Sequence, residues 1–284
     1  MCSRTTISDL LTAKREGRTL VAVSCYDYTT ARLVAQSNVD IILVGDSAAQ
    51  FVLGFDSTLP ATMDLMVTLT AAVRRGAPNT YLIADMPFLS YHVTIPEAIR
   101  NAGRFLTEAG AQMVKIEATS AHLDTIRAVT DAGIAVMAHL GIRPQRISTI
   151  GRFRAEATTA EIAMELIGLA DQMVSAGAGA LLIEGTTAEV SQIITERMGV
   201  PVISCGAGPG CDGQILVAPD ILGLSEGKPP KFAKAYADLA DRSIASFRKY
   251  ADEVRDRRFP DDEHSYHMKA GELQRLKKLL EPRH

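Results

Sequence analysis

Short apolar runs alternate with longer, helix-like segments over most of the chain. The runs are rich in Val, Ile and Leu, as is typical of parallel strands buried on both faces. They lie at residues 19–25, 41–44, 81–84, 113–116, 135–138, 180–183 and 201–205, with a weaker eighth run at 215–218. This alternation predicts parallel strands joined by crossover helices.

The number of repeating units favours a closed barrel over an open sheet. About eight strand and helix units in roughly 250 residues match a (β/α)8 barrel. An open doubly wound sheet usually carries a Gly-rich loop after an early strand, but the single Gly-rich segment here is late, CGAGPGCDGQ at 205–214. That segment is either an anion-binding loop or a set of turn glycines without a ligand. We therefore predict an α/β fold of the (β/α)8 TIM-barrel type.

We expect one domain over residues 1–284, with additional C-terminal helices. No internal repeat or low-complexity linker divides the chain. Residues 268–284 form a predicted helical extension, with Leu273, Leu276, Leu279 and Leu280 on one face. Such a helix is suited to packing on a neighbouring element or on another subunit.

The bulk composition excludes several classes of partner. A formal net charge of −3, with no basic stripe, gives no reason to expect nucleic acid. No segment has the length of a membrane span or of a signal peptide, so we expect a cytoplasmic protein with no membrane partner. Its four cysteines, Cys2, Cys25, Cys205 and Cys211, lack disulfide or zinc spacing, which favours reduced thiols.

Polar side chains follow most of the predicted strands. They are Asp27, Asp46, Asp85, Glu117, His139 and Glu184. In a barrel these strand ends converge on the face where catalytic residues lie. Taken singly, each Asp or Glu could instead cap the next helix. Taken together, converging carboxylates repel one another unless a hard cation neutralises them.

We therefore predict a divalent metal site, Mg2+ or another divalent cation, held by Asp46, Asp85 and Glu117. Lys115 lies two residues before Glu117 and faces the same way, so it needs a counter-charge from the carboxylates or from an anionic substrate. His139 is either a structural histidine or part of the site. Glu184, across the barrel from the metal ligands, is a candidate general base.

The chain also resembles the ketopantoate hydroxymethyltransferase family of the phosphoenolpyruvate mutase and isocitrate lyase superfamily. The resembling segments are CYDYTTARL, LVGDSAAQFVLGFDSTLP, TAAVRRGAPNTYLIADMPF, MVKIE, AHLGIRPQ, CGAG with DGQILV, PKFAK and FPDDEHSYH. Together they cover most of the chain. The resemblance implies a (β/α)8 barrel, Mg2+, and a homo-oligomer, commonly a decamer.

The resemblance also implies a reaction. A one-carbon unit would pass from 5,10-methylenetetrahydrofolate to the 2-keto acid 3-methyl-2-oxobutanoate, giving 2-dehydropantoate through a metal-stabilised enolate. By motif, Asp46, Asp85 and Glu117 match metal ligands. Ser47 and Lys115 match residues that hold the keto acid, which Asp46 and Asp85 also contact. His139 matches an active-site histidine and Glu184 the proton acceptor.

These roles agree with elementary chemistry. A 2-keto acid can chelate a divalent ion through its carboxylate and keto oxygens, which favours removal of the C3 proton by Glu184. Lys115 would balance the charge of the carboxylate or the enolate, and Ser47 would orient the carboxylate. A metal would also offset the desolvation of Asp46 at the end of an apolar strand.

Three departures from the family pattern surround these residues. The chain reads GDSAAQ where the family is close to GDSLGM, so residues 48–50 differ, and Leu69 stands where histidine is common. Residues 152–157 replace a segment that in the family contains glycine, lysine and glutamine. Arg143, Arg152 and Arg154 are either solvated or contact an anion such as the glutamate tail of folate.

Three functions fit this pattern. The first is an authentic, divergent member of the family. The second is a paralogue that applies metal-enolate chemistry to another 2-keto acid or one-carbon donor, because a fold and its metal site do not fix the substrate. The third is a catalytically silent barrel, which has no chemical need for a converging acidic cluster.

Overall fold

The computed structural model describes residues 4–152, 154–225, 227 and 229–281. Cys2, Phe153 and the last three residues of the predicted extension lie outside the described residues. The described chain divides into two compact units, one up to Tyr236 and one from Ala237. The boundary precedes the predicted extension at residue 268, and the assignment of one domain to the whole chain stays a prediction.

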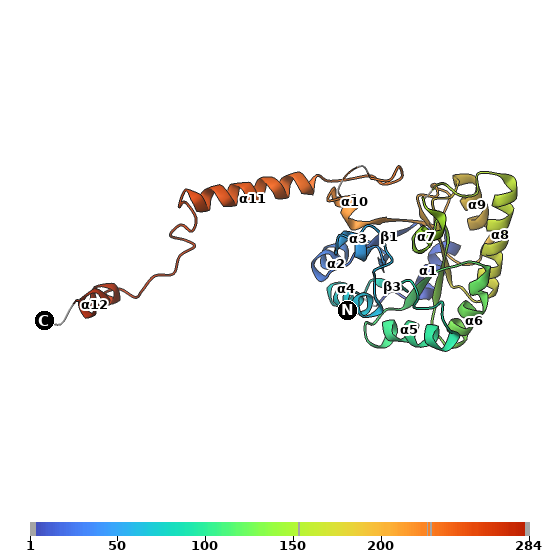
Figure 1. Cartoon of the computed structure of the whole chain (residues 1–284), viewed down its shortest axis with the longest axis horizontal. Helices are drawn as coiled ribbons and strands as arrows, with labels where there is room; N and C mark the ends of the chain where they lie inside the picture. Colours follow the sequence, from blue (N-terminus) through green and yellow to red (C-terminus); the bar gives the residue numbers. More distant parts are fainter. Residues whose placement is uncertain (1–3, 153, 226, 228, 282–284) are drawn as a thin grey trace. The chain divides into compact units, whose positions relative to one another are not determined.

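The first unit is a closed barrel of parallel strands in chain order, surrounded by helices (Figure 1). The strands are β1 Leu20–Ser24, β2 Ile41–Val44, β3 Tyr81–Asp85, β4 Met113–Glu117, β5 Val136–Gly141, β6 Ala180–Glu184, β7 Val202–Cys205 and β8 Gly213–Val217. The predicted barrel and all its strands are therefore confirmed. The eighth and weakest run begins two residues earlier and ends one residue earlier than predicted, because Gly213 pairs with Leu20 in β1.

Helices follow the strands around the barrel. Those of the first unit are α1 Ile7–Arg15, α2 Tyr28–Val34, α3 Ala48–Phe51, α4 Met63–Gly76, α5 Ile95–Thr107, α6 Leu123–Asp131, α7 Ile147–Ile150, α8 Ala160–Ser175, α9 Ala188–Arg197 and α10 Ala218–Leu222, with 3-10 turns η1 Ser120–His122 and η2 Pro144–Arg146. Local sequence sets several of their starts. In α5, for example, the Thr94 side chain accepts a hydrogen bond from the Glu97 backbone N–H, and Pro96 lies in the first turn.

Two apolar layers hold the barrel together. The larger lies between the strands and the outer helices, and contains side chains such as Ile42, Leu82 and Phe105. The smaller fills the amino-terminal half of the barrel interior, where Met113 and Met137 pack beside Leu10 of α1. Because strand side chains alternate, the next inward positions of these strands lie toward the carboxyl end and carry the polar residues.

The Gly-rich segment supports close packing. Gly206 has a φ of +67°, and an added Cβ would lie 2.4 Å from the ring of Phe232. Any other residue would therefore push this aromatic ring away from the chain. The close contact between Gly206 and Phe232 therefore accounts for this glycine, and no bound anion is needed to explain it.

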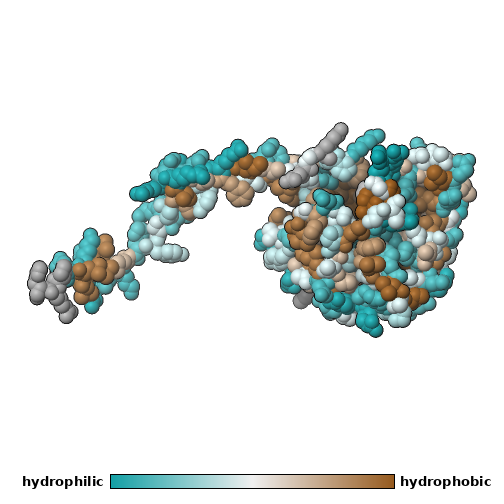
Figure 2. Space-filling model, in the orientation of Figure 1, coloured by the Kyte–Doolittle hydropathy of each residue, from teal (hydrophilic) through white to brown (hydrophobic). Residues whose placement is uncertain are grey.

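The second unit contains α11 Leu239–Arg255 and α12 Glu272–Leu279. Neither helix contains a buried residue among those described. Apolar side chains are exposed along both, as Figure 2 shows: Ile244, Phe247, Tyr250 and Val254 on α11, and the four predicted leucines at 273, 276, 279 and 280. The predicted amphipathic helix is confirmed over residues 272–279.

Across the described ranges, no helix combines the length and the apolar character needed to cross a bilayer. Cys25, Cys205 and Cys211 are free, in agreement with the sequence.

Candidate active site

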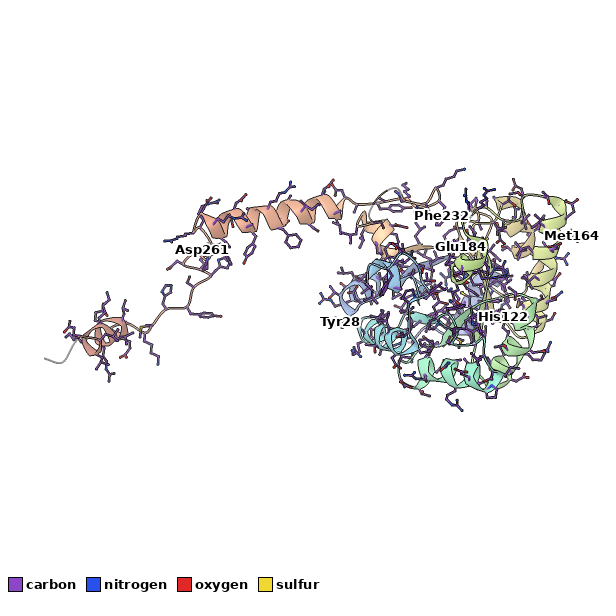
Figure 3. The ribbon with its side chains drawn as sticks, in the orientation of Figure 1. Tyr28, His122, Met164, Glu184, Phe232 and Asp261 are labelled. Atoms are coloured by element: carbon purple, nitrogen blue, oxygen red, sulfur yellow. The ribbon has the colours of Figure 1, made fainter. Side chains whose placement is uncertain are left out.

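A pocket of about 330 Å3 lies at the carboxyl end of the barrel strands. It is lined by every candidate residue that the sequence predicted for the site: Asp46, Ser47, Asp85, Lys115, Glu117, His139 and Glu184. Figure 3 shows Glu184 inside the ring of helices, with Phe232 near the same end of the barrel. Phe232 and Cys205 also line the pocket, although sequence reasoning assigned neither to the site.

The strand register brings these side chains together. Asp85 at the end of β3 pairs with Lys115 of β4, and Glu117 at the end of β4 pairs with His139 of β5. Glu184 ends β6, four strands from β2 in a closed barrel of eight, and therefore faces Asp46 across the pocket. By contrast, Asp27 accepts a hydrogen bond from the Thr30 backbone N–H and caps α2, as the alternative for strand-end acids predicted.

Asp46 lies in the turn after β2 and is almost fully buried. Its backbone N–H donates to Oδ2 of Asp85 at 3.0 Å. Burial, and then the neighbouring charge of Asp85, raises the pKa of Asp46 to about 8. A Cβ added at Gly45 would lie 2.8 Å from Oγ of Ser47, so a larger residue there would displace the Ser47 hydroxyl. The turn thus presents a carboxylate that is readily neutralised by a proton or a cation.

Lys115 supplies the positive charge of the pocket. Its Nζ lies 2.9 Å from Oδ1 of Asp85 and 3.2 Å from Nδ1 of His139. Burial alone would lower the pKa of Lys115, but the carboxylates of Asp85, Asp46 and Glu117 outweigh it and hold the pKa above its usual value. Lys115 is therefore an ammonium group, and the predicted counter-charge is present.

His139 connects the lysine to the candidate base. Burial, and then the charge of Lys115, lowers the pKa of His139, so its ring is neutral. Because the ammonium of Lys115 donates to Nδ1, the ring carries its hydrogen on Nε2. That atom lies 3.4 Å from Oε2 of Glu184, longer than a usual hydrogen bond. His139 therefore orients Glu184 weakly and leaves it room to move.

Gln145 is a site residue that sequence reasoning missed. It is buried in η2, and its Nε2 donates to Oδ2 of Asp46 at 2.9 Å. Its backbone N–H donates to Oε2 of Glu117 at 3.1 Å, while its Oε1 accepts from the hydroxyl of Tyr91 at 2.8 Å. A single neutral residue thus contacts two candidate metal ligands, Asp46 through its side chain and Glu117 through its backbone. The PQ pair after the fifth strand was the only sequence signal for it.

Ser47 lies at the pocket wall, where its hydroxyl contacts that of a tyrosine. Its Oγ lies 2.8 Å from the hydroxyl of the buried Tyr26. Burial raises the pKa of Tyr26, so the phenol stays protonated and can donate to Ser47. Ser47 is then free to direct its own hydroxyl hydrogen into the pocket.

The donor chemistry fits a hard divalent cation. Two buried carboxylate oxygens, Oδ1 of Asp85 and Oε1 of Glu117, receive no hydrogen bond of acceptable geometry, although the first has Lys115 nearby. The described residues contain no preassembled cluster of three or more His, Cys, Asp or Glu side chains arranged as a metal centre. Mg2+ is commonly held through one or two carboxylates, with water and substrate oxygens completing its shell. The predicted set of three carboxylates stays a prediction.

The departures noted in the sequence lie at several places in the fold. Ala48 and Ala49 are buried in the outer core, whereas Gln50 lines the pocket. Leu69 packs in α4 against the same outer core, so an apolar residue is accommodated there. Arg152 and Arg154 lie away from the pocket, along a separate cavity.

The chain is similar to a family of known enzymes. Residues 4–262 match the family model described as ketopantoate hydroxymethyltransferase. The 3-methyl-2-oxobutanoate hydroxymethyltransferase of Moorella thermoacetica is 44% identical over 264 residues, covering 93% of this chain and 98% of that protein. The protein of the same name from Hyperthermus butylicus is 46% identical over 277 residues, covering 98% of this chain and 96% of that one.

Solved structures share the fold at lower identity. A 2,3-dimethylmalate lyase of the PEP mutase/isocitrate lyase superfamily is 18% identical with a TM-score of 0.57, covering 96% of this chain and 94% of that one. A phosphonopyruvate hydrolase in complex with oxalate and Mg2+ is 17% identical with a TM-score of 0.59, covering 97% of each chain. At this identity the likeness shows the fold alone.

Proposed function

The chain belongs to the ketopantoate hydroxymethyltransferase family, and on this premise we propose how its active site works. It is a hydroxymethyltransferase of pantothenate biosynthesis that converts 3-methyl-2-oxobutanoate to 2-dehydropantoate. We propose 5,10-methylenetetrahydrofolate as the donor of the one-carbon unit. The observation that carries the proposed site is the meeting of carboxylates, an ammonium group and a separate strand-end glutamate in one pocket.

We propose that Asp46, Asp85 and Glu117 hold Mg2+ or another divalent cation. The buried Oε1 of Glu117, which receives no hydrogen bond, supports this assignment, as does a structure of the same fold that contains oxalate and Mg2+. Such an ion would polarise the keto carbonyl of the substrate and stabilise the negative charge that develops on its oxygen.

The protein's own side chains bind the keto acid and move its proton. The hydroxyl of Ser47 and the ammonium of Lys115 hold the substrate's negative charge. Glu184, whose side chain is 21% exposed and contacts His139, removes the C3 proton to give an enolate. The enolate carbon forms a bond to the one-carbon unit, whose two bonds to folate nitrogens break, and water supplies the new hydroxyl oxygen. The two nitrogens take up the proton that Glu184 removed and one proton of that water.

Gln145 positions the carboxylates in this scheme. Replacing Gln145 with Met, of similar length, removes the side-chain hydrogen bonds to Asp46 and Tyr91 but retains the backbone N–H that meets Glu117. Outer-shell partners of metal ligands typically contribute about 10- to 100-fold to metal affinity. We therefore expect the dissociation constant for Mn2+, measured by electron paramagnetic resonance, to rise by about 10-fold or more.

The matched control is Gln172→Met on α8, away from the pocket. It should leave Mn2+ affinity unchanged. Equal affinities for the Gln145 variant and the parent protein would contradict the positioning role.

The assembly and location are also proposals. We propose a cytoplasmic homo-oligomer, a decamer by family resemblance, supported by the apolar side chains exposed on α11 and α12. Light scattering should give a mass several times that of one 30.5 kDa chain. Removing residues 268–284 should leave that mass unchanged if the extension frays, and lower it if the extension forms a subunit contact. A monomeric parent protein would contradict the proposal.

The substrate and donor are tested by a product assay. Purified protein is incubated with Mg2+, 5,10-methylenetetrahydrofolate and, in separate reactions, 3-methyl-2-oxobutanoate or other branched 2-keto acids. Mass spectrometry should detect the hydroxymethylated product of 3-methyl-2-oxobutanoate at the highest rate. A higher rate with a different keto acid would instead identify a paralogue. In that case Gln50, which departs from the family pattern and lines the pocket, is the candidate cause of the changed substrate.

A further inference from the structure

A second cavity, of about 1230 Å3, lies beside α8 and the segment that precedes it. Four arginines line it: Arg143, Arg146, Arg152 and Arg154. The carboxylates in its lining are those of Glu156 and Glu165, so four positive charges face two negative ones. The lining carries a formal charge of +2, which favours an anion with two negative charges.

Most of these arginines lack a carboxylate partner. Arg143 lies 3.8 Å from Glu156, but within the described ranges no ion pair involves Arg146, Arg152 or Arg154. Arginines elsewhere on the surface, such as the half-buried Arg104 and the exposed Arg197, do pair with carboxylates. Guanidinium groups bind carboxylates in a planar, two-pronged geometry, so three unpaired groups around one cavity form a site for carboxylates.

The same cavity has an apolar wall. Ile150, Ile162 and Met164 line it and are each more than a third exposed. Apolar side chains beside arginines suit a ligand that has a flat, apolar part and a charged end. The aminobenzoyl-glutamate portion of folate has an aromatic ring followed by two carboxylates.

Residues that line this cavity are bonded to, or adjacent in sequence to, residues of the active-site pocket. Arg143 precedes Pro144, which lines the active-site pocket, and donates to the carbonyl oxygen of Ala118 at 3.3 Å. Ala118 follows the candidate metal ligand Glu117. On the other side, Glu156 forms a β-bridge with Thr186, two residues after the candidate base Glu184. The linings of the cavity and of the active-site pocket therefore meet beside the carboxyl ends of β4 and β6.

We propose that the arginine-lined cavity binds the aminobenzoyl-glutamate tail of the folate donor and directs its one-carbon end toward the active-site pocket. This inference rests on the proposed donor. It assigns to Arg146, Arg152 and Arg154 a role in donor affinity and none in the chemical step. Their replacement should then change the KM for the donor without changing enolate formation.

The test compares R146Q/R152Q/R154Q with R32Q/R75Q/R100Q, which removes three exposed arginines from α2, α4 and α5. The first variant removes the charged hydrogen bonds to the tail, so we expect the KM for 5,10-methylenetetrahydrofolate to rise at least about 10-fold in it. The KM for the keto acid should stay within about twofold in both variants. A donor KM that is equal in the two variants would overturn the proposal.

A truncated donor and a fragment separate this inference from the proposed function. With 5,10-methylenetetrahydropteroate, which lacks the glutamate, the parent protein and the cavity variant should have the same KM; a persisting difference would overturn the assignment of the arginines to the tail. Binding of aminobenzoyl-glutamate, measured by calorimetry without catalysis, should be detected for the parent protein and lost in the cavity variant. That result would support the cavity even if folate supplied no one-carbon unit, whereas no binding to the parent protein would overturn it.

Discussion

Replacing Glu184 with Gln is expected to lower kcat for product formation by about 100- to 10,000-fold, the range typical of general acid–base catalysis. The amide keeps the shape of the side chain and its place beside His139 but cannot accept the C3 proton. Because Glu184 lies across the pocket from the candidate metal ligands, Mn2+ affinity and keto-acid binding should both be retained. Single-turnover kinetics with mass-spectrometric detection measures the loss.

Glu189→Gln is the matched control, since Glu189 is an exposed residue of α9 that does not line the pocket. This variant should have the activity of the parent protein. A Glu184 variant that retained more than about a tenth of the parent kcat would require another base.

The second large effect is expected for Lys115→Met. Lys115 is buried between carboxylates, and removing one partner of a buried ion pair typically lowers stability by about 3–5 kcal/mol. We therefore expect a lower free energy of unfolding and a kcat reduced at least about 100-fold, because the keto acid also loses its cation. A divalent ion would supply the missing positive charge. Mg2+ should thus raise the melting temperature of the variant more than that of the parent protein.

Lys14→Met is the control for the loss of an ion pair, here one that is partly buried. Lys14 on α1 lies 2.7 Å from Asp212, and neither residue lines the active-site pocket. This variant should also lose stability, but Mg2+ should shift its melting temperature no more than it shifts that of the parent. An equal Mg2+ shift for the Lys115 variant and the parent would contradict the metal site proposed beside Lys115.

The barrel could be predicted because its signal repeats along the sequence. Each buried strand produces an apolar run, and several helices begin with a recognisable cap such as Thr94. The eighth strand was shifted because Gly213 and Gln214, which pair with Leu20 and Val21, carry no apolar signal. The division at Tyr236 could not be predicted, since an amphipathic helix has the same sequence pattern whether its apolar face is covered or exposed.

The polar residues of the pocket were predictable for a similar reason. Asp85, Glu117 and Glu184 each end a strand, so a closed barrel necessarily gathers them at one end. Gln145 and Tyr91 escaped prediction because they are neutral, lie off the strands, and meet the site only through hydrogen bonds across long sequence separations. The arginine-lined cavity could not be predicted, since exposed arginines look the same in sequence whether or not they share a cavity.

The most direct test of the account is exchange of the C3 hydrogen of 3-methyl-2-oxobutanoate in D2O without folate, followed by proton magnetic resonance. The proposed site predicts exchange that requires a divalent ion, stops on addition of EDTA, and is lost in the Glu184→Gln variant. No exchange by metal-saturated protein with bound keto acid would contradict enolate formation in this pocket.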